Sequence, residues 1–272
     1  MNHFGDGAEA GMGNVELMDG SPRQGVTGRV EPCLLADHVS VGYGPLLIVE
    51  DVSMQVGYGE AAVILGPNGA GKSTLVKGVM GQLPLSSGSV FLNGRDVSQL
   101  KQSDRVPLGL GYVPQLRDVF PTLSVMENLE MGGFLQPKDE MRARVDEVFA
   151  LFPQLRALSR HRAGTLSGGE RKLLGIARAL MGRSQVLILD EPTSNLSPKV
   201  AAQILELVIH TLAGTGHAVL MIEQRVELAL QAATWGYVLV QGRLRLDAPV
   251  AELRAREDLG ELFLTGGGNK AS

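Results

Sequence analysis

The sequence predicts an α/β fold with a largely parallel central sheet. Short apolar runs alternate along the chain with segments whose apolar residues recur at helical spacing, which is the order expected when helices connect parallel strands. Two of these runs, residues 61–65 and 186–189, are entirely apolar, which predicts strands buried on both faces. The strand signal disappears between about residues 116 and 165, which predicts that a helical block interrupts the α/β core.

The individual elements follow from these patterns. Strands are expected at residues 52–56, 62–65, 89–92, 186–189, 218–222 and 237–240, and helices at residues 72–81, 168–181, 198–212 and 225–233. Gln241-Gly242 separates the last strand from a second alternating run at 243–246, which predicts a hairpin. Inside the helical block, residues 124–132 and 138–152 carry helix-period apolar side chains.

Composition narrows the class of protein. The 272 residues are 44% hydrophobic and 20% charged, which is ordinary for a globular chain with a substantial core. The 25 Lys and Arg are outnumbered by 29 Asp and Glu, so a broad basic surface and a nucleic-acid partner are not expected. Cys33 is the single cysteine, which excludes an intrachain disulfide and favours a reducing compartment.

The two ends of the chain differ in composition from the rest. Residues 1–30 are rich in glycine and lack the basic start and apolar stretch of a signal peptide, so we expect a flexible N-terminal extension. We expect the domain to occupy residues 31–265 and a disordered tail to follow at 266–272. The apolar runs are far shorter than the about 20 residues that cross a bilayer, so we place the chain in the cytosol or on the cytosolic face of a membrane.

A phosphate-binding loop is the strongest motif. It follows a buried strand and opens a helix, the context that this loop requires. Its glycines let backbone N–H groups converge on phosphate oxygens, its lysine reaches the β- and γ-phosphates, and its serine offers a hydroxyl to Mg²⁺. The candidate residues are Gly66, Pro67, Asn68, Gly69, Ala70, Gly71, Lys72, Ser73 and Thr74.

Two acids end the strand at residues 186–189. Asp190 suits the coordination shell of Mg²⁺, and Glu191 is placed to act as the general base that deprotonates the attacking water. On its own this pattern also fits a buried strand that ends in surface acids, and the phosphate loop elsewhere in the chain favours the catalytic interpretation.

A second candidate anion-binding helix start is Ser167-Gly168-Gly169. Such a sequence is more often only a loop with a helix cap. Since one chain needs one cradle per triphosphate, a second cradle makes sense if it contacts a nucleotide held by another subunit.

Together these segments resemble the Walker A, Walker B and signature motifs of the ABC ATPases. The resemblance covers about residues 34–264 and implies a P-loop NTPase fold with a RecA-like parallel core, an antiparallel β part and a helical subdomain at about 116–165. It implies ATP and Mg²⁺ as ligands, with Ser167, Gly168 and Gly169 directed at the ATP of a partner.

The resemblance also implies roles for two further residues. Gln115 resembles the glutamine that contacts the metal and the water and senses the membrane subunits. Tyr43 lies 23 positions before Gly66 and resembles the aromatic that stacks on adenine, a contact worth about 1–3 kcal/mol. An ordinary strand-edge aromatic is the alternative for Tyr43.

A narrower resemblance connects the chain with importers. Residues 111–114, 119–129, 222–224 and 236–239 are similar to the ATP-binding subunits of importers for branched-chain amino acids, and the urea and short-chain amide importers share much of this pattern. This implies a subunit on the cytoplasmic face of the membrane, with two transmembrane permease subunits, a second and non-identical ATP-binding subunit, and an extracytoplasmic solute-binding protein.

The sequence departs from the general ABC pattern at two positions. Gln224 stands where most members carry a histidine that contacts the γ-phosphate, and glutamine donates a hydrogen bond but carries no positive charge. Gln224 is therefore a candidate catalytic contact. Ser197 stands where many members carry an aspartate. The importers for branched-chain amino acids also tend to carry glutamine at the position of Gln224.

Other functional classes stay open at this stage. An ABC ATPase without a membrane partner, acting in translation or DNA repair, is the main alternative. The chain lacks the long coiled-coil insertion of repair members and the second domain of translation factors. A stand-alone P-loop kinase or GTPase would have no use for the serine–glycine–glycine segment.

Overall fold

The structure is a computed structural model that describes residues 32–260. The expected flexible extension at residues 1–30 and the expected tail at 266–272 lie outside the described residues. Among the described residues, the strands are β1 (Pro32–Tyr43), β2 (Leu46–Gly57), β3 (Ala61–Leu65), β4 (Leu85–Leu92), β5 (Arg95–Asp96), β6 (Leu110–Val113), β7 (Val186–Asp190), β8 (Ala218–Ile222), β9 (Trp235–Val240) and β10 (Arg243–Pro249).

The helices of the same range are α1 (Lys72–Val79), α2 (Gln102–Arg105), α3 (Val125–Gly132), α4 (Lys138–Leu151), α5 (Pro153–Ala157), α6 (Gly168–Leu180), α7 (Pro198–Gly214), α8 (Val226–Ala232) and α9 (Val250–Arg254), with short 3₁₀ turns η1 (Val106–Leu108) and η2 (Ala163–Thr165). None of these helices has both the length and the apolar character needed to span a membrane.

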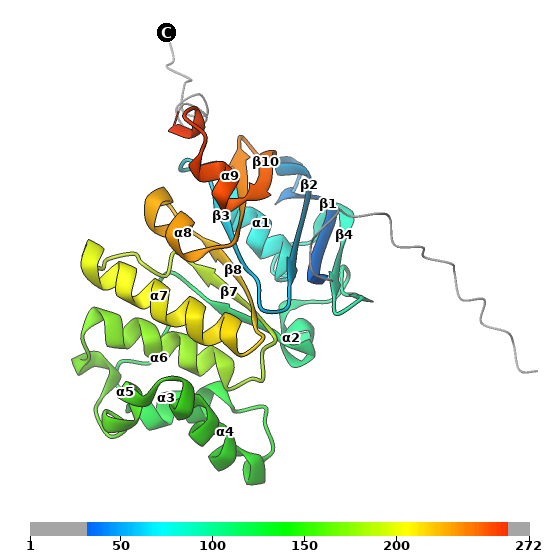
Figure 1. Ribbon diagram of the computed structural model, residues 1–272. Helices are drawn as coiled ribbons and strands as arrows, with labels where there is room; N and C mark the ends of the chain where they lie inside the picture. Colours follow the sequence, from blue (N-terminus) through cyan, green and yellow to red (C-terminus); the bar gives the residue numbers. More distant parts are fainter. Residues whose placement is uncertain (1–31, 261–272) are drawn as a thin grey trace, which may run out of the picture.

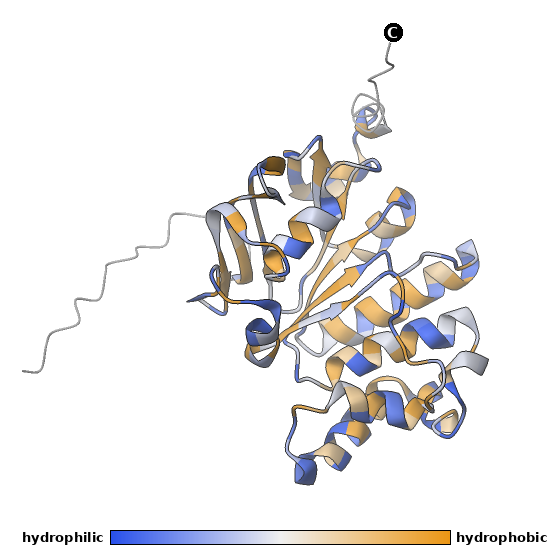
Figure 2. Cartoon of the chain, turned by 180° about the vertical axis from the view of Figure 1, so that it is seen from behind, coloured by the Kyte–Doolittle hydropathy of each residue, from blue (hydrophilic) through white to orange (hydrophobic). Residues whose placement is uncertain are grey.

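A six-stranded sheet forms the centre of the molecule, in the order β10-β9-β3-β8-β7-β6 (Figure 1). The neighbours from β9 to β6 pair in parallel, and β10 pairs antiparallel at the edge. The middle strands are strongly hydrophobic in Figure 2 and are buried along their length. The expected largely parallel sheet is therefore confirmed, and so is the hairpin, whose Gln241 and Gly242 both have positive φ.

Both faces of this sheet are covered because side chains alternate along each strand. In β3, Val63 and Leu65 pack into the same apolar cluster as residues of α6 and α7, while Ala62 and Ile64 face the cluster that contains α1. Strands buried on both faces contain continuous apolar runs, which explains why the sequence predicts β3 and β7 as buried strands.

A second, antiparallel sheet has the order β2-β1-β4-β5 and covers α1 from the other side (Figure 1). Its strands are longer than the sequence predicted, since β2 begins at Leu46 rather than residue 52 and β1 was not predicted as a strand. Register shifts interrupt the β1–β2 pairing, and His38 and Asp51 have positive φ, so the period-two pattern is broken.

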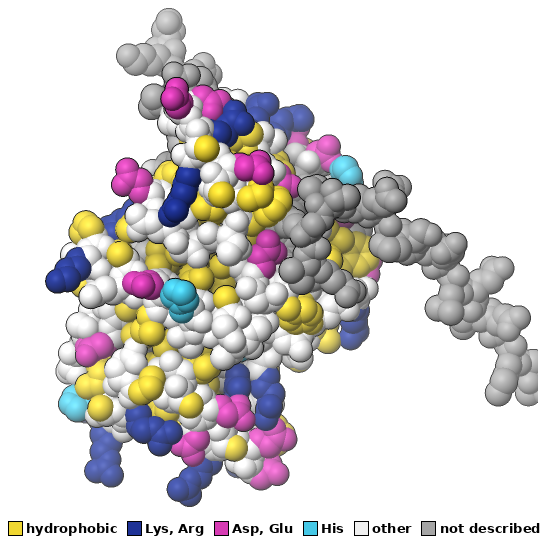
Figure 3. Space-filling model, in the orientation of Figure 1, with side chains coloured by type: hydrophobic (Ala, Val, Ile, Leu, Met, Phe, Trp, Pro, Cys, Tyr) yellow, Lys and Arg dark blue, Asp and Glu magenta, His cyan; other side chains and the backbone are white. Residues whose placement is uncertain are grey.

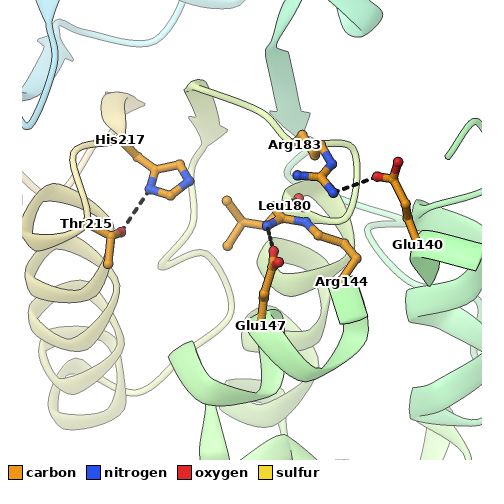
Figure 4. A network of polar contacts seen from close by, with 7 residues as sticks. All are labelled: Glu140, Arg144, Glu147, Leu180, Arg183, Thr215 and His217. Carbon is orange, nitrogen blue, oxygen red and sulfur yellow. Dashed lines mark hydrogen bonds and ion pairs between the residues drawn. The ribbon is translucent and has the colours of Figure 1, made fainter. Parts of the chain in front are cut away.

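The block between residues 116 and 165 contains α3, α4, α5 and η2, at the lower end of the view in Figure 1. Figure 4 shows how α4 meets the core. The Arg144 guanidinium donates to the Leu180 carbonyl at the end of α6, and Arg183, just beyond α6, pairs with Glu140 at 2.7 Å. In Figure 3, Lys and Arg side chains lie interspersed with Asp and Glu over this end of the face shown.

Candidate functional site

The phosphate loop, Gln115, Asp190, Glu191 and Gln224 lie at the carboxyl ends of the parallel strands. Adjacent strands β3, β8, β7 and β6 all end there, so the segments that follow them lie side by side. These segments begin with Gly66 after β3, Glu223 after β8, Glu191 after β7 and Pro114 after β6. The order of strands in the sheet therefore brings together residues that are far apart in the sequence.

At two positions the backbone of the phosphate loop requires glycine. Gly66 (φ 155°) lies so close to Leu239 that an added Cβ would sit 2.1 Å from its carbonyl oxygen. Gly71 caps α1 with φ 99°, which favours glycine because a side chain there would be strained. The N-terminal turn of α1 thus leaves backbone N–H groups available to an anion.

Lys72 folds back over this loop. Its ammonium donates to the carbonyl oxygens of Gly66 at 2.7 Å and Pro67 at 3.0 Å, and its side chain is nearly buried. Burial lowers the pKa of Lys72, and the nearby Glu191 and Asp190 carboxylates oppose this shift. A partly desolvated cation in this position favours binding of an anion.

Both carboxylate oxygens of Glu191 are held by glutamine side chains. Gln115 Nε2 donates to Oε2 at 2.5 Å, and Gln224 Nε2 donates to Oε1. Glu191 has φ 46°, a conformation that is uncommon for a residue with a side chain. The structure therefore brings Gln115, Glu191 and Gln224 into direct contact.

Asp190 is fixed from the neighbouring strand. The Tyr112 hydroxyl on β6 donates to Asp190 Oδ2 at 3.0 Å. Burial raises the pKa of Asp190, while the Tyr112 hydrogen bond opposes this shift. A half-buried carboxylate of this kind is stabilised by a nearby cation.

A cavity of about 330 Å³ lies against the loop. Tyr43, at the end of β1, lies at its rim with 46% of its surface exposed, and Lys77 of α1 donates to its hydroxyl at 3.2 Å. Tyr43 is thus both a strand-end aromatic and a cavity residue. The cavity is lined by Tyr43, Ile48, Asn68, Gly69, Ala70, Gly71, Lys72, Ser73, Thr74, Glu191 and Gln224.

The serine–glycine–glycine segment does not line this cavity. Ser167 caps α6, with its hydroxyl and backbone N–H both bound to the Glu170 carboxylate at 2.7 and 2.8 Å. Ser167 and Gly168 are exposed, whereas Gly169 is buried against Val200. An exposed helix start away from the chain's own phosphate loop is the geometry needed for contact with a second subunit.

The residues predicted to hold Mg²⁺ are Ser73, Gln115 and Asp190. Ser73 lies in the cavity lining, Asp190 is a half-buried carboxylate, and Gln115 contacts Glu191, the residue that follows Asp190. Among residues 32–260 no group of three or more His, Cys, Asp or Glu residues could hold a metal. Since Mg²⁺ in such sites takes one or two protein ligands plus substrate phosphates and water, the residues fit this ion.

Sequence reasoning missed the residues that support the site. Glu223 is buried and accepts hydrogen bonds from the Thr193 backbone N–H at 2.9 Å and hydroxyl at 2.7 Å, which fixes the segment after Glu191. Tyr112 and Glu223 lie in the segments 111–114 and 222–224, which indicated only the resemblance to importers. A tyrosine in a buried strand, or an acid directly after one, needs a polar partner, and this was the available signal.

Comparisons with known proteins agree on the family. The sequence profile described as "ABC transporter" matches residues 49–194. A probable branched-chain amino acid transport ATP-binding protein of Archaeoglobus fulgidus is 39% identical over 226 residues, which cover 83% of this chain and 96% of that protein. A high-affinity branched-chain amino acid transport ATP-binding protein of Pseudomonas aeruginosa is 40% identical over 230 residues, covering 85% and 98%.

Similarity of fold extends to solved structures. The ADP conformation of an ATP-binding cassette of an ABC transporter superposes with a TM-score of 0.79 and covers 86% of this chain and 99% of that chain. At 24% identity this similarity supports the fold alone. The profile and the two relatives carry the assignment further: this chain belongs to the ABC transporter family of ATP-binding proteins, which hydrolyse ATP.

Proposed function

We propose that this chain powers an ABC importer for branched-chain amino acids or a related small polar solute such as urea or amides. The observation that carries the proposal is the identity of 39% and 40% to two proteins named as branched-chain amino acid transport ATP-binding proteins. The match spans 96% and 98% of those proteins, so it includes the helical block as well as the shared ATPase motifs.

ATP is the substrate in this proposal, and the phosphate loop holds it. The backbone N–H groups of residues 68–74 and the Lys72 ammonium bind the β- and γ-phosphates, and Tyr43 stacks on the adenine at the rim of the cavity. Glu191 takes the proton of the attacking water as general base. Gln115 and Gln224, which both donate to Glu191, orient its carboxylate toward that water.

The fit described above supports Mg²⁺ as the metal. Ser73, Asp190 and Gln115 would hold it, and when bound it neutralises charge on the β- and γ-phosphates. This chain's own contribution is to place the carboxylate of Asp190 through the Tyr112 hydroxyl. Catalysis then consists of positioning and electrostatic stabilisation.

A complete site requires a second ATP-binding subunit. Ser167 and Gly168 are exposed, and none of Ser167, Gly168 and Gly169 lines the chain's own cavity, which supports contact of this helix start with a partner's ATP. We infer that ATP favours the closed pair of subunits and that hydrolysis releases it, a shift of population driven by differential affinity. The second subunit is a non-identical ATPase in this proposal.

The helical block is the proposed dock for one of the two transmembrane permease subunits, on the cytoplasmic face of the membrane. The importer has a solute-binding protein on the other side. Leu116, directly after Gln115, is 64% exposed, and Phe134 and Leu135 are 77% and 70% exposed. Large apolar side chains in such exposed positions support an interface with another protein.

Gentle extraction of the tagged full chain from membranes tests the assembly. The expected result is the recovery of two multispanning subunits and a second ATPase in stoichiometric amounts. The matched control is the same chain with Leu135→Asp, which should lower recovery of the membrane subunits and leave nucleotide binding intact. Recovery of ribosomes or repair proteins without a membrane subunit would contradict the transport function.

A substitution at Gln224 tests its neutral contact with Glu191. Gln224→His should change kcat several-fold and leave the KM for ATP within about twofold, because a histidine beside a carboxylate takes up a proton that glutamine cannot carry. Turnover of the variant should also become pH-dependent between about pH 6 and 8. Steady-state ATPase assays across this range check the prediction, and the same kcat in both proteins at every pH would show that the position does not matter.

A further inference from the structure

A nearly buried ion pair links the signature helix to the segment after Gln115. Lys172 lies on α6, five residues after Ser167, and its ammonium is 3.1 Å from Asp118 Oδ2. Only 7% and 11% of the two side chains are exposed. Removing two charges from water is costly unless each has a close partner, so these side chains depend on each other.

Lys172 makes a second contact, with the backbone of Gln115 at the candidate site. Its ammonium also donates to the backbone carbonyl of Gln115 at 3.2 Å. The Gln115 side chain in turn donates to Glu191 at 2.5 Å. A continuous series of polar contacts therefore runs from α6 through the main chain of Gln115 to the Glu191 carboxylate.

The far end of the same segment is anchored separately. The Asn128 side chain accepts from the Phe120 backbone N–H at 2.7 Å and donates to its carbonyl at 3.0 Å, and the Arg178 guanidinium lies 4.9 Å from the centre of the Phe120 ring. Close packing holds Asp118 as well, since a Cβ on Gly175 would lie 3.0 Å from it. Asp118 is thus a fixed counter-ion for Lys172.

Packing around Gln115 itself is looser. A hollow of about 390 Å³ is lined by the segment that begins at Gln115, by α6 and by residues 194–196. Gln115, Asp118, Gly168 and Lys172 are among its lining residues. Beside this open space, the Lys172 hydrogen bond is a direct polar contact between α6 and the backbone of Gln115.

We propose that Lys172 is a positioning residue for ATP hydrolysis, which, with Asp118 as its counter-ion, holds the main chain of Gln115 so that its side chain orients Glu191. The inference rests on the roles proposed above for Gln115 and Glu191. Because Lys172 stands one turn beyond Ser167-Gly168-Gly169, it also makes the position of Gln115 depend on the position of the signature helix. A displacement of about 1 Å in a catalytic group can cost about 100-fold in rate.

The test uses five variants of the full chain, assayed with the membrane subunits that co-purify with it. Lys172→Met should lower kcat at least about tenfold and leave the KM for ATP within about threefold, because it moves Gln115 without touching the nucleotide. Lys172→Arg should retain most of the turnover, since a guanidinium can both pair with Asp118 and donate to a carbonyl. Lys101→Met, an exposed lysine just before α2 and outside the helical block, is the matched control and should behave as the wild type.

The doubly neutral variant Asp118→Asn/Lys172→Met separates positioning from stability. Removing both charges should recover the thermal midpoint lost in Lys172→Met, because it removes the unpaired buried charge. It should not recover kcat, because the donor to the Gln115 carbonyl is still missing. Wild-type kcat in this double variant would overturn the proposal and leave the pair a purely structural contact.

The same assays distinguish this inference from the function it rests on. If Glu191→Gln retains full turnover, the proposed catalytic arrangement fails whatever Lys172 does. If Glu191→Gln is inactive and Lys172→Met has normal kcat, only the positioning role of Lys172 is overturned.

Discussion

Glu191→Gln is expected to retain ATP binding and to lose hydrolysis by about 10²–10⁴-fold, the usual contribution of a positioned general base. Glutamine has nearly the same shape as glutamate, and it cannot accept the proton of the attacking water. In the native chain both carboxylate oxygens accept a glutamine amide, one from Gln115 and one from Gln224. The variant keeps one acceptor oxygen, and the other amide must turn its own oxygen to the new NH₂ group.

The measurement combines an equilibrium ATP titration with single-turnover hydrolysis in the assembled complex. Glu227→Gln, an exposed glutamate on α8, is the matched control and should leave both quantities unchanged. Turnover of Glu191→Gln equal to the wild type would exclude Glu191 as the base. Loss of both binding and hydrolysis would instead place Glu191 in nucleotide binding.

The parts of the site that are local in sequence could be predicted. The phosphate loop needs glycines with unusual φ between a buried strand and a helix. The strand, the glycines and the helix all lie within residues 61–79. The same holds for Asp190 and Glu191, which directly follow the apolar run of β7. Helices α1, α6, α7 and α8 were predicted within two residues of their ends because their apolar spacing is regular.

The antiparallel sheet was harder to predict for a physical reason. A strand is recognised by strict alternation, and β1 loses it where its pairing with β2 shifts register between Ala36 and Val39 and again between Val39 and Val41. His38 in this stretch has φ 51°, which turns the following side chains out of phase. Tyr43 could therefore be placed only by its resemblance to a family aromatic, and not by a predicted strand.

The supporting contacts depend on tertiary structure. Tyr112 and Asp190 are 78 residues apart, Gln115 and Lys172 are 57 apart, and their approach follows from the pairing of β6 with β7 and the packing of α6. No local pattern contains this information. What the sequence offered was the presence of polar side chains in apolar surroundings, each of which needs a partner.

Lys72→Met is expected to lower kcat/KM for ATP by at least about 100-fold, comparable to the loss of one preorganised charge-stabilising donor. The Lys72 ammonium lies over the phosphate loop, bound to the Gly66 and Pro67 carbonyls, and its side chain is nearly buried. Burial lowers its pKa, so the native fold holds a cation at some cost in an environment where a phosphate would stabilise it. Methionine fills the same space without charge or donor.

The variant should fold, because the loop conformation is set by glycines and by the backbone bond from the Leu75 N–H to the Gly71 carbonyl at 2.8 Å rather than by the lysine. A thermal midpoint near that of the wild type together with a large rise in the dissociation constant for ATP would locate the effect in phosphate binding. Lys101→Met, an exposed lysine before α2, controls for the loss of one positive charge. Wild-type ATP affinity in Lys72→Met would mean that the backbone N–H groups of the loop bind the phosphates alone, since the cation is the one element that the substitution removes.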